Sequence, residues 1–243
     1  MDYLKVSNLS AFYGKRQVLF DVGLEIKAGE WVSIVGANGS GKTTFLKCLA
    51  GWDIKNHGEY SDGTKKIALV QRRNAISFVP TPSDLPEYLK GRELIDIIVR
   101  EKQGKINPKW DEICQTLDGD IWLNNEISSL SWGTKKKLCL GIGLCVKPDF
   151  LFLDESFDGL DAAASFRTRQ MLLQLCHEDK IGLLSASHSW ESVFAYSDEI
   201  YFLQEGRIVR HLGKGEFDET KQQAKDMEKI IVAAFGPSGH EVL

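Results

Sequence analysis

Hydrophobic positions along this chain follow two spacings, and the first of them is typical of β-strands. Short apolar runs broken by turn residues fill 3–20, on both sides of a turn at 13–15, and a further run covers 22–26. Such runs predict an antiparallel β element at the start of the chain. Other apolar runs have the length of buried strands. They lie at 32–35, 67–70, 76–79, 150–153, 181–186 and 200–203, the last leading into a hairpin with 207–209.

The second spacing is helical, and it separates the predicted strands from one another. It occurs in the segments 42–51, 83–147, 162–177 and 218–235. Strands that alternate with helices favour an α/β fold built on a parallel sheet. We therefore expect one domain, 1–243, in which 83–147 is an inserted helical lobe. A chain of 243 residues with 43% hydrophobic content can bury a core of that size.

Composition changes this picture only by exclusion. The charged fraction of 26% and the net charge of −4 argue against a protein that carries nucleic acid on its surface. The longest apolar run, 138–146, is half of what a membrane-spanning helix requires, and Met1 opens straight into strand-like sequence without a signal peptide. We expect a cytoplasmic protein whose membrane role, if any, is peripheral. Five scattered cysteines read as reduced thiols that fill the core, at 48, 114, 139, 145 and 176.

The glycine-rich turn after 32–35 carries the first candidate chemistry. Gly36, Gly41, Lys42 and Thr43 complete the pattern GxxxxGK followed by Ser or Thr, between a predicted strand and a predicted helix. Backbone N–H groups of such a loop converge on a phosphate, and the helix N-terminus adds positive potential. Lys42 would reach the β- and γ-phosphates, and the Thr43 hydroxyl would bind Mg²⁺. The alternative is an ordinary turn with a surface lysine.

A second cluster of candidate residues follows two later strands. Asp154 and Glu155 end the strand 150–153, where open α/β sheets build their sites. Asp154 would hold Mg²⁺, directly or through water, and Glu155 would act as general base on the attacking water. The alternative is a pair of solvated acids. His188 follows the strand 181–186 and could reach the γ-phosphate or hold that water, although a histidine is more often structural.

Taken together, these residues resemble the nucleotide-binding subunit of an ABC transporter over nearly the whole chain. A phosphate loop alone would leave kinases and GTPases open. Five motifs in the family's order make the resemblance specific: the Walker A motif at 36–43, a signature LSWGT at 130–134 with a lysine-rich helix start, the Walker B motif at 151–155, the D-loop at 158–161, and the switch histidine at 188.

The resemblance implies both a fold and a set of site residues. The fold would be that of a P-loop NTPase, a RecA-like parallel sheet with an antiparallel β subdomain and a helical subdomain at about 83–147. The cofactors would be ATP and Mg²⁺. Implied catalytic residues are Glu155, His188 and Lys42; implied metal ligands are Thr43, Asp154 and Thr81. Implied ATP contacts are Tyr13 on adenine and Gly36, Asn38, Gly39, Ser40, Gly41, Lys42, Thr43, Thr44, Ser131, Gly133 and Asp161.

The resemblance also implies a mechanism. Two subunits, identical or not, would hold two ATP molecules head to tail, so that the Ser131 hydroxyl and the Gly133 amide contact the γ-phosphate bound by Lys42 of the opposite subunit. Hydrolysis would release the pair. A membrane permease on another chain would follow this cycle through the helical lobe, and the chain would be peripheral on the inner face of the cell membrane. The cargo and the direction of transport are not encoded in such a subunit.

Four departures from the family pattern qualify this expectation. Thr81 stands where the Q-loop glutamine belongs, which puts coupling to the permease in doubt; Gln71 lies before the preceding strand and is a poor substitute. Trp132 replaces the first signature glycine, Thr134 the signature glutamine, and Ser156 the proline after Walker B. Since the main catalytic residues are present, we expect an active, slow ATPase.

Two other classes of function compete with the transport motor. One is a soluble ABC ATPase of DNA repair, translation or cofactor assembly, although the coiled-coil insertion or tandem cassettes of the first two are not visible. The other is a regulatory module that binds ATP with weak turnover, for which Thr81 is the main support.

Overall fold

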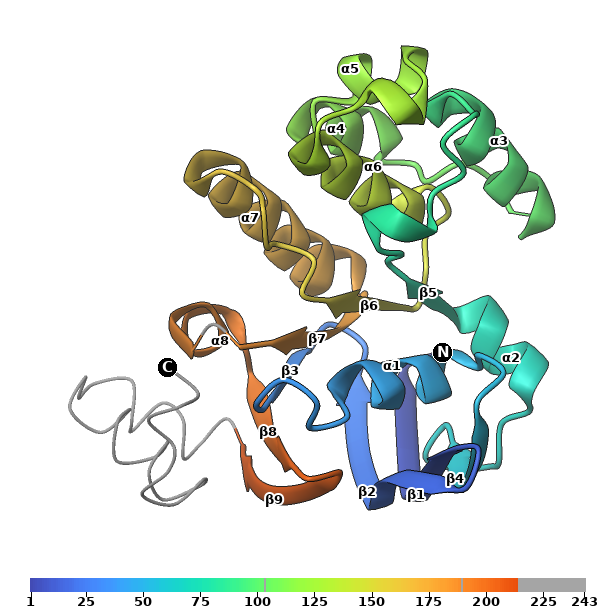
Figure 1. Ribbon diagram of the computed structural model, residues 1–243, viewed down its shortest axis with the longest axis vertical. Helices are drawn as coiled ribbons and strands as arrows, with labels where there is room; N and C mark the ends of the chain where they lie inside the picture. Colours follow the sequence, from blue (N-terminus) through green and yellow to red (C-terminus); the bar gives the residue numbers. More distant parts are fainter. Residues whose placement is uncertain (103, 189, 214–243) are drawn as a thin grey trace.

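The computed structural model describes residues 1–102, 104–188 and 190–213 (Figure 1). The helix predicted at 218–235 lies outside these residues. In the described part, helices and strands alternate along the chain around a six-stranded sheet, which confirms the predicted α/β class.

The central sheet has the strand order β5-β6-β7-β3-β8-β9. Its first five strands run parallel, and only β9 is antiparallel to its neighbour β8. The bounds are β3 Trp31–Val35, β5 Ile76–Phe78, β6 Phe150–Asp154, β7 Gly182–Ser187, β8 Glu199–Gln204 and β9 Arg207–Leu212. The β3, β6 and β7 runs are almost wholly buried, because helices or the second sheet cover both faces.

A second sheet of three antiparallel strands lies beside the first, in the order β2-β1-β4. The strands are β1 Tyr3–Tyr13, β2 Arg16–Lys27 and β4 Lys55–Ser61. The hairpin of β1 and β2 was predicted from its broken apolar runs. β4 was not, because its sequence KNHGEYS buries a single side chain, Tyr60, and has no apolar alternation.

The segment 67–70 corrects a prediction. It is not a strand: Ala68 precedes helix α2, which spans Leu69–Ala75. The side-chain Oε1 of Gln71 accepts from the amide of Ala68 at 2.8 Å, which caps the helix start. The apolar run misleads because only Ile67 is buried, whereas Val70 is 67% exposed.

Two hydrophobic clusters cover the two faces of the central sheet. Phe150 and Phe152 of β6 point into the cluster shared with α1 (Lys42–Ala50) and the antiparallel sheet. Leu151 and Leu153 point into the cluster shared with α7 (Ala162–Asp179) and with the helices drawn above the sheet in Figure 1. This strand is therefore fixed from both sides, and its last residue Asp154 emerges at a rigid edge.

Among its described residues, the predicted helical lobe has four α-helices that pack together, α3 Gly91–Glu101, α4 Trp110–Thr116, α5 Gly119–Asn124 and α6 Trp132–Leu144. Its centre is the fully buried indole of Trp122, whose Nε1 donates to the Leu117 carbonyl at 2.8 Å. Gly91 and Gly141 give it space, since a Cβ at Gly91 would lie 3.2 Å from ring atom Cε3 and a Cβ at Gly141 would lie 3.0 Å from ring atom Cη2. A short helix that was not predicted, α8 Trp190–Tyr196, follows β7.

Candidate nucleotide site

The loop between β3 and α1 has the geometry of a phosphate cradle. Gly39 and Gly41 have φ angles of 79° and 110°, which side chains disfavour. A Cβ at Gly36 would lie 2.1 Å from the carbonyl oxygen of Leu203, so only glycine fits there. The amide of Gly206 in the β8–β9 turn donates to the Ser40 carbonyl at 2.9 Å and holds the loop from behind. The supporting role of this hairpin was not predicted.

Lys42 begins α1 and lies across this loop. It is 5% exposed, and its Nζ donates to the carbonyl oxygens of Gly36 at 2.6 Å and Ala37 at 3.2 Å. Burial lowers the pKa of the Lys42 ammonium, while the nearby carboxylates of Glu155 and Asp154 oppose that shift. The Lys42 ammonium thus has neutral hydrogen-bond partners and two carboxylates nearby. A phosphate oxygen can replace one of the carbonyl oxygens and would form a stronger, charge-assisted hydrogen bond.

An open cleft of about 420 Å³ lies over the loop. It brings together most of the predicted phosphate ligands with one predicted catalytic acid. The lining residues are Arg16, Val18, Asn38, Gly39, Gly41, Lys42, Thr43, Thr44 and Glu155. Arg16 and Val18 at the start of β2 were not predicted as site residues. The sequence offered one signal for Arg16: it is a basic residue directly after the turn that contains Tyr13, the predicted adenine contact.

Asp154, the last residue of β6, meets α1 at the cleft. The Thr43 hydroxyl is hydrogen-bonded to the Asp154 carboxylate. Burial raises the pKa of Asp154 and the Glu155 charge adds to the rise, whereas Thr43 and Lys42 lower it. One hydroxyl and one desolvated carboxylate are the oxygen ligands that Mg²⁺ prefers, and a cation would offset the cost of burying this charge. The residues present therefore fit a magnesium ion.

Glu155 follows Asp154 and turns toward the end of β7. Its Oε1 lies 3.5 Å from Nδ1 of His188, which also lies 3.9 Å from Oδ2 of Asp158. Ligand atoms of these three side chains all lie within 4.8 Å of one another. Strands distant in sequence thus place a carboxylate and an imidazole at one rim of the cleft, a pairing that can accept and orient a proton.

The signature segment does not line this cleft. Ser131 is the exposed N-cap of α6, and its Oγ accepts from the Thr134 amide at 3.2 Å. Trp132 is 56% exposed, and Gly133 lies against the D-loop, where a Cβ would come 3.2 Å from the Gly159 carbonyl oxygen. The structure thus separates Ser131 and Gly133 from the phosphate loop of their own chain.

Three more predicted ligands also lie outside the cleft lining. Tyr13 ends β1 and is 52% exposed. Asp161 caps α7: its Oδ1 accepts from the Ala164 amide at 2.8 Å, and this bond lowers the pKa of the carboxyl. Thr81 caps a 3-10 turn at 82–84, where its Oγ1 donates to Oδ2 of Asp84 at 2.8 Å. Its hydroxyl is occupied locally, and its predicted place at the metal remains a prediction.

The fold and this site define a P-loop NTPase domain. The sequence model of the ABC transporter family matches residues 19–158. This chain therefore belongs to the ABC transporter family, and the resemblance drawn from its motifs is confirmed.

Curated relatives and solved structures agree with this assignment. The chain is 29% identical over 213 residues to the sulfate/thiosulfate import ATP-binding protein CysA of Yersinia pseudotuberculosis, covering 84% of this chain and only 59% of that protein. It is 29% identical to the phosphate import ATP-binding protein PstB 1 of Ligilactobacillus salivarius, over 96% of this chain and 93% of that one.

Solved structures also share the fold. The ATP-binding subunit of an ABC transporter superposes with a TM-score of 0.79 at 22% identity, over 93% of this chain and 98% of that one. A bacterial ABC transporter cassette solved as a dimer gives 0.76 at 24% identity, over 87% and 98%. Within the described residues, no helix of this chain has both the length and the apolar character needed to cross a membrane.

Proposed function

We propose that this chain is the ATP-binding and ATP-hydrolysing subunit of a transporter whose membrane permease is a separate chain. The observation that carries the proposal is the single cleft shared by Lys42, Thr43 and Glu155, which combines a phosphate cradle with a carboxylate base. The relatives named above are import ATP-binding proteins, which favours this function over a soluble ATPase of repair or translation. It also favours import as the direction.

Each residue at the cleft has a separate task in this proposal. The loop amides and Lys42 bind the β- and γ-phosphates, and Thr43 with Asp154 holds Mg²⁺. The ion would neutralise charge that develops on the transferred phosphoryl group. Glu155 accepts a proton from the attacking water, and His188 orients that carboxylate. Thr81 would contribute at most through the metal shell, so turnover would be slow.

A second ATPase subunit would complete the site. Ser131 and Gly133 lie at the exposed start of α6, away from their own phosphate loop, so a second subunit arranged head to tail could bring their donors to the γ-phosphate held by Lys42. Asp161, the last residue of the D-loop and the N-cap of α7, would face that interface, and exposed Tyr13 would be free to stack on adenine.

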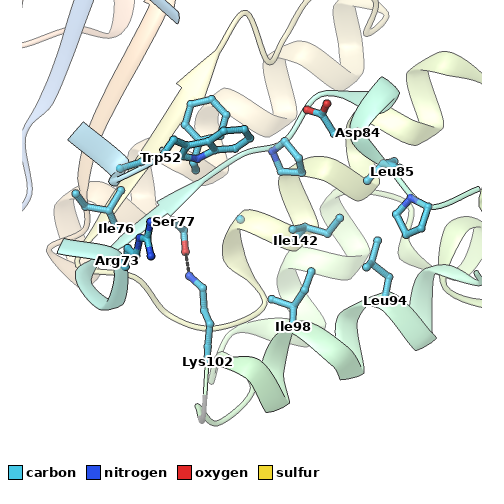
Figure 2. A pocket seen from close by; sticks show the side chains of 15 residues that line it. Trp52, Arg73, Ile76, Ser77, Asp84, Leu85, Leu94, Ile98, Lys102 and Ile142 are labelled. Atoms are coloured by element: carbon cyan, nitrogen blue, oxygen red, sulfur yellow. Dashed lines mark hydrogen bonds between the residues drawn. The ribbon is translucent and has the colours of Figure 1, made fainter. Parts of the chain in front are cut away.

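The permease would dock on an apolar groove between the sheet and the helical subdomain, which we place at about 83–147. The groove has a volume of about 380 Å³ and is drawn in Figure 2. Trp52, Ile76 and Phe78 border it from the sheet side, and Leu94 and Ile98 of α3 from the helical side.

Two basic residues, Arg73 and Lys102, line this groove, and the Arg73 guanidinium donates to the Gly51 carbonyl. Nζ of Lys102 donates to Oγ of Ser77 at 2.5 Å at the groove wall (Figure 2), and burial lowers the pKa of that ammonium. A permease segment with an apolar face and one carboxylate would match the groove. This contact with the permease, rather than a membrane span of its own, would then hold the chain at the inner face of the cell membrane.

Purified full-length chain tests the enzymatic part of this proposal. We expect Mg²⁺-dependent ATP hydrolysis by wild type, a loss of at least about 100-fold in Glu155→Gln, and an ATP-dependent dimer of that variant in size exclusion. A wild type no faster than Glu155→Gln, or a variant that stays monomeric at saturating Mg-ATP, would contradict it.

Affinity purification from detergent-solubilised membranes tests the partner, and recovery of no membrane protein would favour the soluble alternative.

A further inference from the structure

Glu155 has a backbone conformation that is unusual for its residue type. Its φ angle is 45°, in the left-handed region where a side chain crowds the backbone, and such a residue persists only where its surroundings hold it. Both of its backbone groups are held. The amide donates to the carbonyl oxygen of Ala186 at 3.1 Å, and the carbonyl accepts from Nζ of Lys136 at 2.9 Å and from the amide of Asp158 at 3.3 Å. Lys136 is therefore the one side chain among these three hydrogen-bond partners of the Glu155 backbone.

Lys136 differs from the two lysines beside it in α6. Nζ of Lys135 pairs with the Glu87 carboxylate at 2.7 Å, and Lys137 pairs with Asp118. Lys136 is 8% exposed and points inward, to a backbone carbonyl rather than to a carboxylate. Burying an ammonium costs free energy that a single carbonyl offsets only in part, so its position is better explained by the conformation it holds than by stability.

The helix that carries Lys136 also contacts the loop after Glu155. The indole of Trp132 packs on Gly159, where a Cβ would come 3.0 Å from Cδ1 and 3.3 Å from Nε1 of the ring. Gly159 has a φ angle of 82° and leaves the space that the indole fills. Three residues in the first turns of α6, Trp132, Gly133 and Lys136, thus touch the segment 155–159 at both ends.

We propose that Lys136 is a positioning residue that holds the left-handed conformation of Glu155 and ties it to the signature helix of the same subunit. The inference rests on the proposed function, in which Ser131 at the start of that helix contacts ATP bound to the other subunit. The start of α6 would then contact the ATP bound to the other subunit. Lys136 of the same helix would position Glu155 at the ATP bound to its own subunit. Trp132, in place of the family's glycine, adds a second contact to that connection.

Steady-state ATPase kinetics of the full chain test the role of Lys136. Lys136→Met keeps the volume of the aliphatic stem and removes the donor, and we expect kcat to fall about tenfold, the effect of one hydrogen bond to a charged group. KM for ATP, and the affinity for a fluorescent ATP analogue, should change less than about twofold, because the phosphate ligands are untouched. Lys136→Arg, which keeps a cationic donor, should recover most of kcat.

Lys135→Met is the matched control, since it removes a neighbouring ammonium that reaches only Glu87, and it should behave as wild type. Unchanged kcat in Lys136→Met would overturn the inference, as would equal losses of turnover and ATP affinity, or an arginine variant as slow as the methionine one. If Lys136→Met is unfolded at the assay temperature, Lys136→Leu, which also lacks a donor, takes its place and the same split decides. A wild type without turnover would instead contradict the proposed function.

Discussion

Oε1 of Glu155 lies 3.5 Å from Nδ1 of His188, although the two residues come from different strand ends of the sheet. The imidazole can therefore hold the carboxylate or share its proton. We expect His188→Ala to lower kcat by about 10- to 100-fold, at the lower end of what acid–base partners contribute. Binding of a fluorescent ATP analogue should be unchanged, because His188 does not line the cleft over the phosphate loop. A variant that loses binding as well would place the histidine on the phosphate instead.

Lys42 holds two carbonyl oxygens of its own loop, so its loss has two consequences. In Lys42→Ala the Gly36 and Ala37 carbonyls lose their donor and the phosphates lose a cation. We expect affinity for ATP to fall about 10- to 100-fold, as measured by titration calorimetry. Lys47→Ala, on the same helix, is the control, and it should bind ATP as wild type does. Equal affinities of Lys42→Ala and wild type for ATP would show that the Lys42 ammonium stays hydrogen-bonded to the Gly36 and Ala37 carbonyls and does not bind the phosphates.

Asp154 makes the stability of the nucleotide-free chain depend on pH. Its pKa is raised in the folded chain, mainly by burial, so between the unfolded value of 3.8 and the raised folded pKa the folded state binds more protons than the unfolded state. The contribution of this group to the free energy of unfolding therefore decreases as pH rises through the folded pKa. Asp154→Asn keeps the shape without the charge, and at neutral pH it should unfold at a higher denaturant concentration than wild type.

The same variant also tests the metal site. With Asp154 neutral, the carboxylate ligand is lost, so Mg²⁺ should no longer add to the thermal stabilisation that ATP gives. Urea unfolding at pH 5 and pH 8 measures the first effect, and thermal shifts with ATP in the presence and absence of Mg²⁺ measure the second. An Asp154→Asn variant less stable than wild type at pH 8 would mean that the carboxylate stabilises the free chain.

The sequence predicted the central strands well because both of their faces are buried. Runs such as 32–35 and 150–153 are apolar without alternation, and no other element tolerates them in segments this short. The prediction failed for two elements that are largely exposed to solvent. In 67–70 an apolar run opens a surface helix, and in β4 a polar strand is held by its pairing with β1 rather than by its own side chains.

The phosphate loop could be located from the sequence because its ligands are contiguous, and Asp154, Glu155 and His188 because they follow predicted strands, but three other contributors could not. Arg16 reaches the cleft through the β1–β2 hairpin, and Gly206 holds Ser40 from a turn at the far end of the chain. Lys136 was one of three adjacent lysines, and only the packing of α6 on the loop after β6 distinguishes it. Thr81 was placed at the metal by its position in a motif, whereas locally it serves as a cap.

Ser131 has a structural role that can be separated from its proposed role at the second ATP. Its Oγ caps α6 by accepting from the Thr134 amide, so Ser131→Ala should cost about 1 kcal/mol of stability in addition to any loss of dimerisation. Ser131→Asp keeps an acceptor at the same place, and its charge is favourable at a helix N-terminus. We expect this variant to be as stable as wild type but to repel the γ-phosphate of the other subunit.

In a Glu155→Gln background, size exclusion with Mg-ATP should therefore find Ser131→Asp monomeric although fully folded by thermal melting. Ser131→Ala in the same background should retain part of the dimer, because it removes one donor without adding a repelling charge. Ser129→Asp, two residues earlier and exposed, places the same charge outside the cap and should dimerise. A Ser131→Asp protein that still dimerises would mean that the start of α6 does not meet a phosphate at all, and the cap would then be the only role of this serine.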